Sequence, residues 1–471
     1  MPIDWKTIRR IHFVGIKGVA MAALAVWAGE AGYRVSGSDV AEEFPSDEVL
    51  AKAKIKVLPG FDASHIKKTN PDLVIFTGAH EGRENVEVEE AVLRGIPILP
   101  HGRALGDVMG SKRQISVAGS HGKTTTTAMI ATILAHAGFD PSYAAGCGEI
   151  FGLGPPGHKG NGDWFVAEAD EYVTDPQHDP TPRFLWQPPE VVVVTNIDFD
   201  HPDVYANLEE VQQAFIKLSR RERGLRTTII NADDPASKVL HAVPEDIILY
   251  GFTPAADIRI THVGFGNERT FFTLADRGTI VGEFALKVPG RHNAANAAAA
   301  AAACRTVGVS WEGIREGLLT FGGTKRRFEK IGLARGTRIY DDYAHHPKEI
   351  QATLAGARAW YPKARIIAVF QPHTYSRTYA LFGDFVKSFH DADIVAIADI
   401  YASAREHETL GVSSHMLARE IEKHQPHVVY TKDYETTAMY LRQHIREGDV
   451  ILFMGAGDIY TWSKRFLKDQ L

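Results

Sequence analysis

The feature that most constrains the fold of this 471-residue chain is a repeated alternation of short apolar runs with helical segments. Apolar runs of about four to eight residues are typical of buried strands, and the amphipathic spacing between them is typical of helices in a parallel α/β unit. We therefore expect an α/β fold built on parallel sheets. Because a chain of this length exceeds what one hydrophobic core usually organises, several domains are expected.

Three series of apolar runs predict three domains, at 1–109, 110–326 and 327–471. The predicted strands are 11–16, 33–39, 55–60, 73–79 and 96–102, then 115–120, 163–170, 190–198, 227–234 and 247–252, and finally 337–344, 365–372, 393–400, 427–433 and 449–458. Residues 256–290 alternate differently and favour antiparallel strands. The alanine-rich segment 292–308 predicts a close-packed helix, because alanine has the highest helix propensity.

Composition and charge exclude several classes of protein. A net charge of −6 with 23% charged residues is typical of a globular protein and argues against a nucleic-acid partner. The first residues lack the pattern of a signal peptide, and no uninterrupted apolar stretch of about 18 residues occurs, so we expect a cytoplasmic protein with no membrane partner. Cys147 and Cys304 are too few for a disulfide framework or a cysteine-based zinc site.

The strongest local motif is VAGSHGKTTTTAMI, residues 117–130, which begins like a strand and ends like a helix. Gly119 and Gly122 allow the backbone to turn with its N–H groups pointing inward. Lys123 supplies a mobile cation, and Thr124 supplies a hydroxyl for Mg²⁺ at a helix N-terminus. Valine occupies the first glycine position of the full Walker pattern, so the match is to the shorter GxxGK[ST][ST] form. The motif predicts a phosphate site, with a purely structural turn as the alternative.

A second glycine motif, GIKGVAM at 15–21, lies where a dinucleotide fingerprint would, but Lys17 and Ala20 replace its second and third glycines. Asp39 follows at the end of the next predicted strand, 24 residues beyond Gly15, where an acidic residue can bond a ribose. The motif is compatible with a nucleotide diphosphate, with NAD, or with a plain packing turn.

Polar clusters follow several predicted strands. EADE (168–171) and NIDFDH (196–201) place Glu168 and His201 at the carboxyl edge of a sheet, where open α/β sheets bind ligands. A carboxylate and an imidazole there are able to hold a divalent cation beside the phosphate loop, and the alternative is that they cap the following helices. In the third predicted domain the candidates are Arg327, Tyr343, His345, His373 and Arg377.

These motifs, in this order, resemble the Mur ligases of peptidoglycan synthesis. The colinear set is GIKGVAM, GSHGKTTTT, EADE, TNIDFDH, PGRHNAANA, KRRFE, DDYAHHP, FQPHTYSRT and MGAGDI, and the resemblance runs from about residue 10 to about residue 460. It implies a Rossmann-like N-terminal domain that holds a UDP moiety, a central P-loop ATPase domain, and a Rossmann-like C-terminal domain that closes on the cleft.

The resemblance also implies residue roles. The implied catalytic residues are Lys123, Glu168, His201 and Arg327. The implied ATP contacts are Gly119, Ser120, His121, Gly122, Lys123, Thr124, Thr125, His292, Asn293, Asn296, Arg327 and Asp342. The implied substrate contacts are Gly15, Lys17, Gly18, Ser38, Asp39, Tyr343, His345, His373 and Arg377. The implied metal ligands are Thr124, Glu168 and His201. Thr374 stands where the family often has a second arginine, and Lys217, the nearest candidate for the carbamoylated lysine of some relatives, is left out of the site.

The activity that the resemblance implies is ATP-dependent joining of L-alanine to the lactyl carboxylate of UDP-N-acetylmuramate, through an acyl phosphate, with release of ADP and phosphate. The expected cofactors are ATP and Mg²⁺, the expected partners are these small-molecule substrates, and the expected state is a monomer or a weak homodimer.

Three alternatives stay open. The extended segment 172–189 and the FDH triplet favour a related ligase that attaches L-alanyl-γ-D-glutamyl-meso-diaminopimelate, whereas FQPHTYSRT and AREHETLGVSS (404–414) favour the alanine enzyme. We favour L-alanine, because loops vary more freely than substrate contacts. A nicotinamide oxidoreductase would use the first glycine motif alone, and an ATP-binding protein without ligase activity would use the phosphate loop alone.

Overall fold

The computed structural model describes residues 3–470 except 202, 221–223, 225, 244–245, 403–405 and 407, so part of the 404–414 segment lies outside the described residues. The chain divides into two compact units. One unit consists of Met1–His262, Phe272–Phe284 and Ala295–Gly322, and the other of Val263–Phe271, Ala285–Ala294 and Gly323–Leu471.

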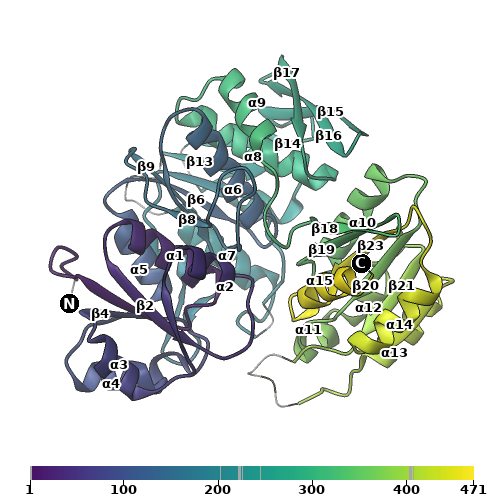
Figure 1. The fold of residues 1–471 in the computed structure, drawn as a ribbon. Helices are drawn as coiled ribbons and strands as arrows, with labels where there is room; N and C mark the ends of the chain where they lie inside the picture. Colours follow the sequence, from purple (N-terminus) through teal and green to yellow (C-terminus); the bar gives the residue numbers. More distant parts are fainter. Residues whose placement is uncertain are drawn as a thin grey trace. The chain divides into compact units, whose positions relative to one another are not determined.

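The N-terminal residues form a five-stranded parallel sheet with strand order β3-β2-β1-β4-β5. Figure 1 draws this part of the chain in purple and labels β2 and β4. The strands of the sheet are β1 (Arg10–Val14), β2 (Arg34–Asp39), β3 (Lys56–Pro59), β4 (Leu73–Phe76) and β5 (Ile98–Pro100). All five strands were predicted from the apolar runs. Because the chain steps outward from β1 in both directions, the carboxyl ends of β1 and β4 form a topological switch point, where open sheets of this kind bind ligands.

Helices cover both faces of this sheet. They are α1 (Val19–Glu30), α2 (Asp47–Lys52), α3 (Ala63–Thr69), η1 (Gly82–Glu84), α4 (Val86–Leu93) and α5 (His101–Met109). Phe13 packs into a core with α1 and α5, while its neighbour Val14 packs with α3 and α4 on the opposite face. The larger of these cores also contains Phe165 and Ala167, which belong to the second predicted domain.

The central sheet has ten strands in the order β17-β16-β15-β14-β13-β12-β6-β9-β7-β8. They are β6 (Arg113–Ala118), β7 (Ser142–Ala144), β8 (Gly157–His158), β9 (Trp164–Ala169), β12 (Val191–Val194), β13 (Thr227–Asn231), β14 (Ile247–Gly251), β15 (Ile258–Gly266), β16 (Arg269–Asp276) and β17 (Thr279–Leu286). Strands β7, β9, β6, β12, β13, β14 and β15 pair in parallel. The two-residue connections at 267–268 and 277–278 have positive φ throughout, as in type I′ hairpin turns, which agrees with the antiparallel strands predicted for 256–290.

Four helices accompany the central sheet: α6 (Lys123–His136), α7 (Leu208–Ser219), α8 (Arg291–Thr306) and α9 (Trp311–Thr320); η3 (Pro235–Leu240) is shorter. The predicted alanine-rich helix is α8, and the side chains of residues 297–303 are at most 1% exposed. A Cβ atom at Gly317 of α9 would lie 2.7 Å from Ile133 Cα of α6, so these two helix backbones are in direct contact. Small residues therefore set the close packing of this helical layer.

The extended segment 172–189 forms a hairpin of β10 (Val173–Asp175) and β11 (Asp179–Pro182), followed by η2 (Arg183–Trp186). Asp175 Oδ2 accepts a hydrogen bond of 3.1 Å from Arg83 N in η1. A Cβ atom at Gly106 of α5 would lie 2.2 Å from Trp186 O, so η2 packs directly on α5. The additional length of this segment is therefore used in packing against elements of the first predicted domain.

The C-terminal sheet has six strands in the order β18-β19-β23-β20-β21-β22. They are β18 (Glu329–Ala334), β19 (Thr337–Asp342), β20 (Ile366–Phe370), β21 (Ile394–Ala398), β22 (Val428–Lys432) and β23 (Val450–Met454), and only the β18–β19 pair is antiparallel. The helices are α10 (Pro347–Trp360), α11 (Tyr375–Ala380), α12 (Phe382–Val386), α13 (Ser414–Glu422), α14 (Tyr434–His444) and α15 (Ile459–Gln470). Buried clusters lie on both faces of the sheet.

The two compact units do not divide the chain as the sequence predicts. The first two predicted domains share one unit because β7 and β9 contribute to the N-terminal core. The tip of the β15–β16 hairpin belongs to the C-terminal unit, where Glu268 accepts a hydrogen bond of 2.9 Å from Tyr361 Oη. The boundaries at 109/110 and 326/327 stay predictions.

Two further expectations concern the cysteines and membrane-spanning helices. Cys147 and Cys304 are both buried free cysteines. Among the helices of the described residues, none combines the length and the apolar character needed to cross a membrane.

Candidate functional site: the loop between β6 and α6

The predicted phosphate loop connects β6 to α6 at residues 119–122. Gly119 has φ +130° and Gly122 has φ +84°, values that L side chains rarely adopt. A Cβ atom at Gly119 would lie 2.0 Å from Thr195 Oγ1, so the loop requires glycine there for space as well as for conformation. Lys123 and Thr124 begin the helix that follows, with Thr124 buried and Thr125 partly buried.

Residues after β12 brace this loop. Thr195 Oγ1 donates to His121 O at 2.6 Å, and His121 N donates to Asn196 Oδ1 at 3.0 Å. Asp198 N donates to Ser120 Oγ at 2.8 Å. The loop conformation is therefore fixed by the neighbouring strand end as well as by its own glycines.

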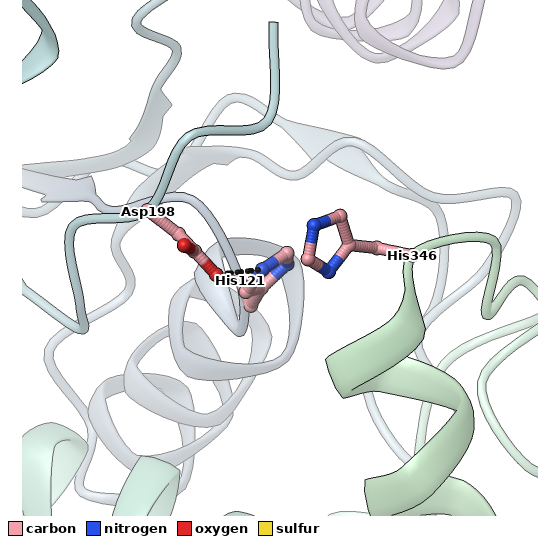
Figure 2. Close-up of side chains that lie close together, drawn as sticks. All are labelled: His121, Asp198 and His346. Carbon is pink, nitrogen blue, oxygen red and sulfur yellow. Dashed lines mark hydrogen bonds and ion pairs between the residues drawn. The ribbon is translucent and has the colours of Figure 1, made fainter. Parts of the chain in front are cut away.

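The His121 side chain points toward the Asp198 carboxylate, with 3.3 Å between Nε2 and Oδ2 (Figure 2). His346, which is also drawn there, caps α10 in the other compact unit. Within its own unit, His121 is thus oriented by an ion-pair partner that the NIDFDH motif supplies.

Lys123 turns back over the loop. Its Nζ donates to Gly119 O at 2.5 Å and Ser120 O at 3.3 Å, and it lies 2.9 Å from Glu171 Oε2. Burial on its own would lower the pKa of Lys123, but the carboxylates of Glu171, Asp170 and Glu168 outweigh it and raise that pKa above its ordinary value. Lys123 therefore stays positively charged beside the loop at 119–122.

Among the predicted adenine-side residues, Asn296 reaches the loop. A Cβ atom at Gly122 would lie 2.6 Å from Asn296 Oδ1, so the amide of α8 packs on the loop glycine. Asn293 instead donates from Nδ2 to Pro289 O at 2.7 Å, and His292 is exposed. These two residues belong to the other compact unit.

The predicted metal ligands lie at two strand ends. Glu168, the penultimate residue of β9, accepts a hydrogen bond from Gly146 N. His201, in the loop after β12, lies 3.8 Å from Glu171 Oε1 through its Nε2 and packs against the edge of the Tyr172 ring. The Glu171 carboxylate therefore lies close to both Lys123 and His201.

The neighbouring Asp170 pairs with Arg183 at 2.9 Å. Burial opposes ionisation of Asp170, but Arg183, Lys123 and His201 lower its pKa to about 2. Asp170 is therefore an ionised carboxylate among the cations around it. Lys217, on α7, is exposed.

In the first glycine motif, Gly15 has φ +80°, and a Cβ atom there would lie 2.4 Å from Thr77 Cγ2. Both carboxylate oxygens of Asp39 are engaged within the loop, by Lys17 N at 2.6 Å and by Val40 N at 2.8 Å. The Lys17 side chain donates to Glu42 O at 2.8 Å. Asp39 thus braces the turn at the switch point, and Gly18 is the N-cap residue of α1.

Ser38 faces the interior of the first sheet. Its Oγ donates at 2.5 Å to Glu87, a buried carboxylate that also contacts His12 Nε2 at 3.0 Å and His65 Nδ1 at 2.7 Å. Burial raises the pKa of Glu87, but hydrogen bonds from His12, Ser38 and the Asp62 backbone amide outweigh it and hold the pKa below its ordinary value. The Ser38 hydroxyl is therefore part of a buried polar cluster.

In the C-terminal unit, the two arginines of KRRF lie in different environments. Arg326 is buried, bonds Asp341 Oδ2 at 3.1 Å and donates to Gly455 O at 2.7 Å. Arg327 is partly exposed, with its Nη1 3.5 Å from Glu349 Oε1 and its guanidinium over the Tyr343 ring. Arg326 is thus structural, and Arg327 is the arginine with an accessible head group.

The other predicted residues of that unit are held by local contacts. Asp342 is buried and accepts from Phe328 N at 2.7 Å and Ala344 N at 2.8 Å, so it fixes the turn after β19. His345 Nδ1 lies 2.9 Å from Tyr343 O, which orients its ring. Burial raises the pKa of Asp342.

His373 and Arg377 lie together at the start of α11. Arg377 Nη1 is 3.4 Å from His373 Nδ1, and the His373 ring stacks on Tyr401. Thr374, between them, has φ +70°, which is strained for a β-branched residue. The structure therefore brings the two predicted muramyl-contacting residues into one cluster.

Sequence reasoning missed two residues that shape the phosphate loop. Glu171 lies in the EADE motif, where a role was predicted for Glu168, and Thr195 is the first residue of TNIDFDH, where a role was predicted for His201. The signal available for Glu171 was its polar character directly after a buried strand, next to Glu168. Its contact with Lys123, 48 residues away in the chain, depends on the loop after β9 and has no local signature.

Comparison with protein families gives three matches along the chain. The model described as Mur ligase family, catalytic domain, matches residues 10–113; the Mur ligase middle domain matches 165–304; and the Mur ligase, glutamate ligase domain matches 326–457. Together they cover the N-terminal and C-terminal sheets and the central strands from β9 to β17, whereas the loop at 119–122 lies between the first two matches.

Two curated relatives are similar over almost the whole chain. The UDP-N-acetylmuramate--L-alanine ligase of Desulfitobacterium hafniense (strain Y51) is 43% identical over 451 residues, which cover 96% of this chain and 97% of that protein. The protein of the same name from Caldanaerobacter subterraneus subsp. tengcongensis is 40% identical over 474 residues, which cover 100% and 99%.

Solved structures agree with these matches. The UDP-N-acetylmuramate-alanine ligase of Thermotoga maritima superimposes with a TM-score of 0.82 at 28% identity, covering 98% of this chain and 99% of that one. A murein peptide ligase from Psychrobacter arcticus has the same fold, with a TM-score of 0.71 at 24% identity and 98% of each chain covered. With its three-domain α/β architecture and its glycine-bounded lysine loop, this chain belongs to the Mur ligase family.

Proposed function

We propose that this protein is an ATP-dependent ligase that joins L-alanine to the lactyl carboxylate of UDP-N-acetylmuramate in peptidoglycan precursor synthesis. The observation that carries the proposal is full-length similarity, at 43% identity, to a relative that bears this name. The loop geometry supports it, because Gly119, Gly122 and Lys123 have the conformation and charge that a phosphate group requires.

The proposed chemistry overcomes the poor electrophilicity of a carboxylate. An oxygen of the lactyl carboxylate attacks the γ-phosphorus of ATP, the bond to the β-phosphate oxygen breaks, and ADP leaves. The neutral amine of L-alanine then attacks the carbonyl carbon of the acyl phosphate, phosphate leaves, and the amine loses a proton. Lys123 neutralises charge on the transferring phosphoryl group, and positioning supplies most of the remaining acceleration.

The proposed Mg²⁺ ligands are Thr124, Glu168 and His201. Thr124 is buried at the start of α6. Glu168 lies near the carboxyl end of β9 and His201 follows β12, and these two strands flank β6 in the sheet. This donor set fits a divalent cation bound beside phosphate oxygens. When bound, the cation would reduce the negative charge of the nucleotide phosphates, while the chain's own residues orient them.

The remaining assignments belong to the same proposal. Gly15, Gly18 and Lys17 would approach the diphosphate of the UDP moiety. The residues Arg327, Asp342, Tyr343, His345, His373 and Arg377 are proposed contacts of ATP and the muramyl substrate. The proposal also includes a cytoplasmic location and a monomer or weak homodimer.

The choice of amine donor rests on two observations. The relatives with 38–43% identity over nearly the full chain carry the alanine ligase name. The segment 172–189, whose length favours the tripeptide, packs against η1 and α5. Both support L-alanine, with glycine or L-serine as slower substrates, because an apolar pocket discriminates one methyl group by only about 1–3 kcal/mol.

A competition assay tests this function. The protein is incubated with ATP, Mg²⁺, UDP-N-acetylmuramate and equal concentrations of L-alanine and L-alanyl-γ-D-glutamyl-meso-diaminopimelate, and the UDP product is analysed by mass spectrometry. We expect the L-alanine adduct to predominate. A predominant tripeptide adduct would overturn the donor but retain the ligase, whereas ATP binding with no amide product would indicate a non-ligase ATP-binding protein.

A further inference from the structure

Glu171 connects the phosphate-loop lysine with the predicted metal-side histidine. Its side chain is 1% exposed. Its Oε2 lies 2.9 Å and its Oε1 3.3 Å from Lys123 Nζ, and the same Oε1 lies 3.8 Å from His201 Nε2. One buried carboxylate is therefore shared by two side chains with different proposed roles.

The loops that carry Glu171 and His201 are fastened together. Glu171 O accepts a hydrogen bond of 2.6 Å from the Tyr205 hydroxyl, and Tyr205 N donates to His201 O at 3.0 Å. Tyr205 is only 8% exposed. Tyr205 therefore links the backbone of Glu171 to the backbone of His201, so the proximity of the two residues does not depend on their side-chain contact alone.

Glu171 also completes the surroundings of the lysine ammonium. The three N–H groups of Lys123 are directed at Gly119 O, Ser120 O and the Glu171 carboxylate. A lysine side chain carries about 2 kcal/mol of rotamer entropy, so a fixed ion-pair partner removes much of its freedom before a phosphate group arrives.

The carboxylates of the motif also have other contacts. Asp170 pairs with Arg183, and Glu168 accepts from Gly146 N. Glu171 contacts Lys123 Nζ through both of its carboxylate oxygens. Its negative charge also lies where the phosphates of a nucleotide would approach, and it opposes their binding unless a divalent cation offsets the repulsion.

We propose that Glu171 is a positioning residue of the phosphoryl-transfer site, which orients Lys123 and His201 together and makes nucleotide affinity depend on a divalent cation. This inference rests on the proposed role of Lys123 as a phosphate contact. It adds a specific function for the second glutamate of the motif: Glu171 weakens the binding of metal-free nucleotide and, in return, sets the geometry for transfer.

The test compares Glu171→Gln with Glu171→Asp. Glutamine keeps the shape and a hydrogen-bond acceptor but removes the charge, so we expect metal-free ADP to bind at least fivefold more tightly by calorimetry, while kcat with Mg²⁺ and ATP falls at least tenfold. Aspartate keeps the charge, but its shorter side chain moves the carboxylate away from Lys123. Metal-free ADP affinity should therefore stay within twofold of the native protein, and kcat should lie between those of the native protein and Glu171→Gln. Tighter binding with slower turnover is not the signature of a damaged fold.

Glu190→Gln is the matched control, because Glu190 is also an ion-paired carboxylate. It pairs with Arg113 and directly precedes β12, at the end of that strand away from the loop at 119–122. This substitution should change neither parameter. The inference is overturned if Glu171→Gln leaves ADP affinity and kcat within twofold of native, or if it lowers ADP affinity, kcat and the melting temperature together. If Lys123→Ala binds ADP as tightly as the native protein, the phosphate role fails and this inference fails with it; if only the Glu171 variants behave otherwise than expected, the proposed function stands.

Discussion

At the scale of single residues, the long side chain of Lys123 carries a cation that its neighbours hold in one orientation. Its ammonium is held by two loop carbonyl groups and by a carboxylate that is almost completely buried. Removing it therefore has two separable effects. Under the proposed function, the transferring phosphoryl group loses its positive partner, and in the fold Glu171 is left without its ion pair.

We predict that Lys123→Ala lowers kcat about a hundredfold or more, since one such electrostatic contact is worth roughly 3 kcal/mol in the transition state. The melting temperature should also fall, because an unpaired buried carboxylate is unfavourable. ADP release measured at saturating ATP tests the first effect, and thermal melting of Lys123→Ala/Glu171→Gln tests the second by recovering stability without activity. Lys238→Ala, an exposed lysine of the same unit, is the control. A Lys123→Ala rate above half the native rate would refute the assignment.

His373 shows a different electrostatic environment in the C-terminal unit. Burial lowers its pKa to about 3, and the neighbouring His345, Arg377 and Arg326 act in the same direction. The folded-state pKa thus lies below the unfolded value of about 6.5. His373 is neutral near pH 7 and acts there as a hydrogen-bonding group, not as a cation.

This depressed pKa predicts how stability depends on pH. Below about pH 6.5 the unfolded chain takes up a proton that folded His373 does not, so stability falls by up to about 1.4 kcal/mol per pH unit until the folded pKa is reached. We expect His373→Gln to lose about 1–2 kcal/mol less than the native protein between pH 7 and pH 5 in urea unfolding. His424→Gln, at an exposed histidine of the same unit, is the matched control. Identical pH profiles for His373→Gln and the native protein would contradict the assignment.

The sequence predicted the β6–α6 loop better than its contacts. The turn at Gly119 and Gly122 and the position of Lys123 at the start of the helix could be predicted because loop conformation and charge are local properties of a motif. The contacts of Lys123 with Glu171, and of Gly119 with Thr195, join separate strand ends, so no spacing rule indicates them.

At the scale of elements, helices α6 and α9 meet at a glycine. A Cβ atom at Gly317 would lie 2.7 Å from Ile133 Cα, and backbone atoms cannot move aside as a flexible side chain can. Intrinsic helix propensity and tertiary packing therefore oppose each other at this position.

We predict that packing prevails and that Gly317→Ala destabilises the protein by about 1–3 kcal/mol, although alanine is favoured over glycine by about 1 kcal/mol within a helix. Gly29→Ala in α1 is the matched control, because no atom lies within 4 Å of the added Cβ. It should stabilise the protein by up to about 1 kcal/mol. Chemical denaturation of both variants gives the comparison, and a stabilised Gly317→Ala variant would show that the helices separate at little cost.

The strands were predicted where they are buried and apolar. Runs such as VVVV of β12 and VILFM of β23 have few alternatives once they are flanked by polar turns. Strand β11 was missed because its sequence, DPTP, contains two prolines and no apolar run, and β7 and β8 were missed because they are only three and two residues long. These short strands exist because neighbouring segments supply their hydrogen-bond partners.

At the scale of the whole molecule, the chain forms two compact units, each with its own core. Proteins built in this way often unfold in more than one step. The cores contain fully buried leucines, such as Leu218 on α7 in one unit and Leu354 on α10 in the other.

We predict two calorimetric transitions that these leucines distinguish. Replacing a buried leucine with alanine costs about 2–5 kcal/mol, so Leu354→Ala should lower one transition and Leu218→Ala the other. Because each variant serves as the control for the other, the experiment does not require the units to be isolated. A single transition that shifts as a whole in both variants would mean that the units unfold as one.

The alanine run of α8 has a consequence for mutational tolerance. Its sequence is nearly uniform, as in low-complexity segments, where substitutions are often tolerated. In the fold, residues 297–303 are at most 1% exposed, so each methyl group is enclosed by its neighbours on all sides. Added volume would force the surrounding helices apart, and added polarity would be left without a partner. The alanine run of α8, despite its low-complexity sequence, is therefore one of the segments least tolerant of substitution.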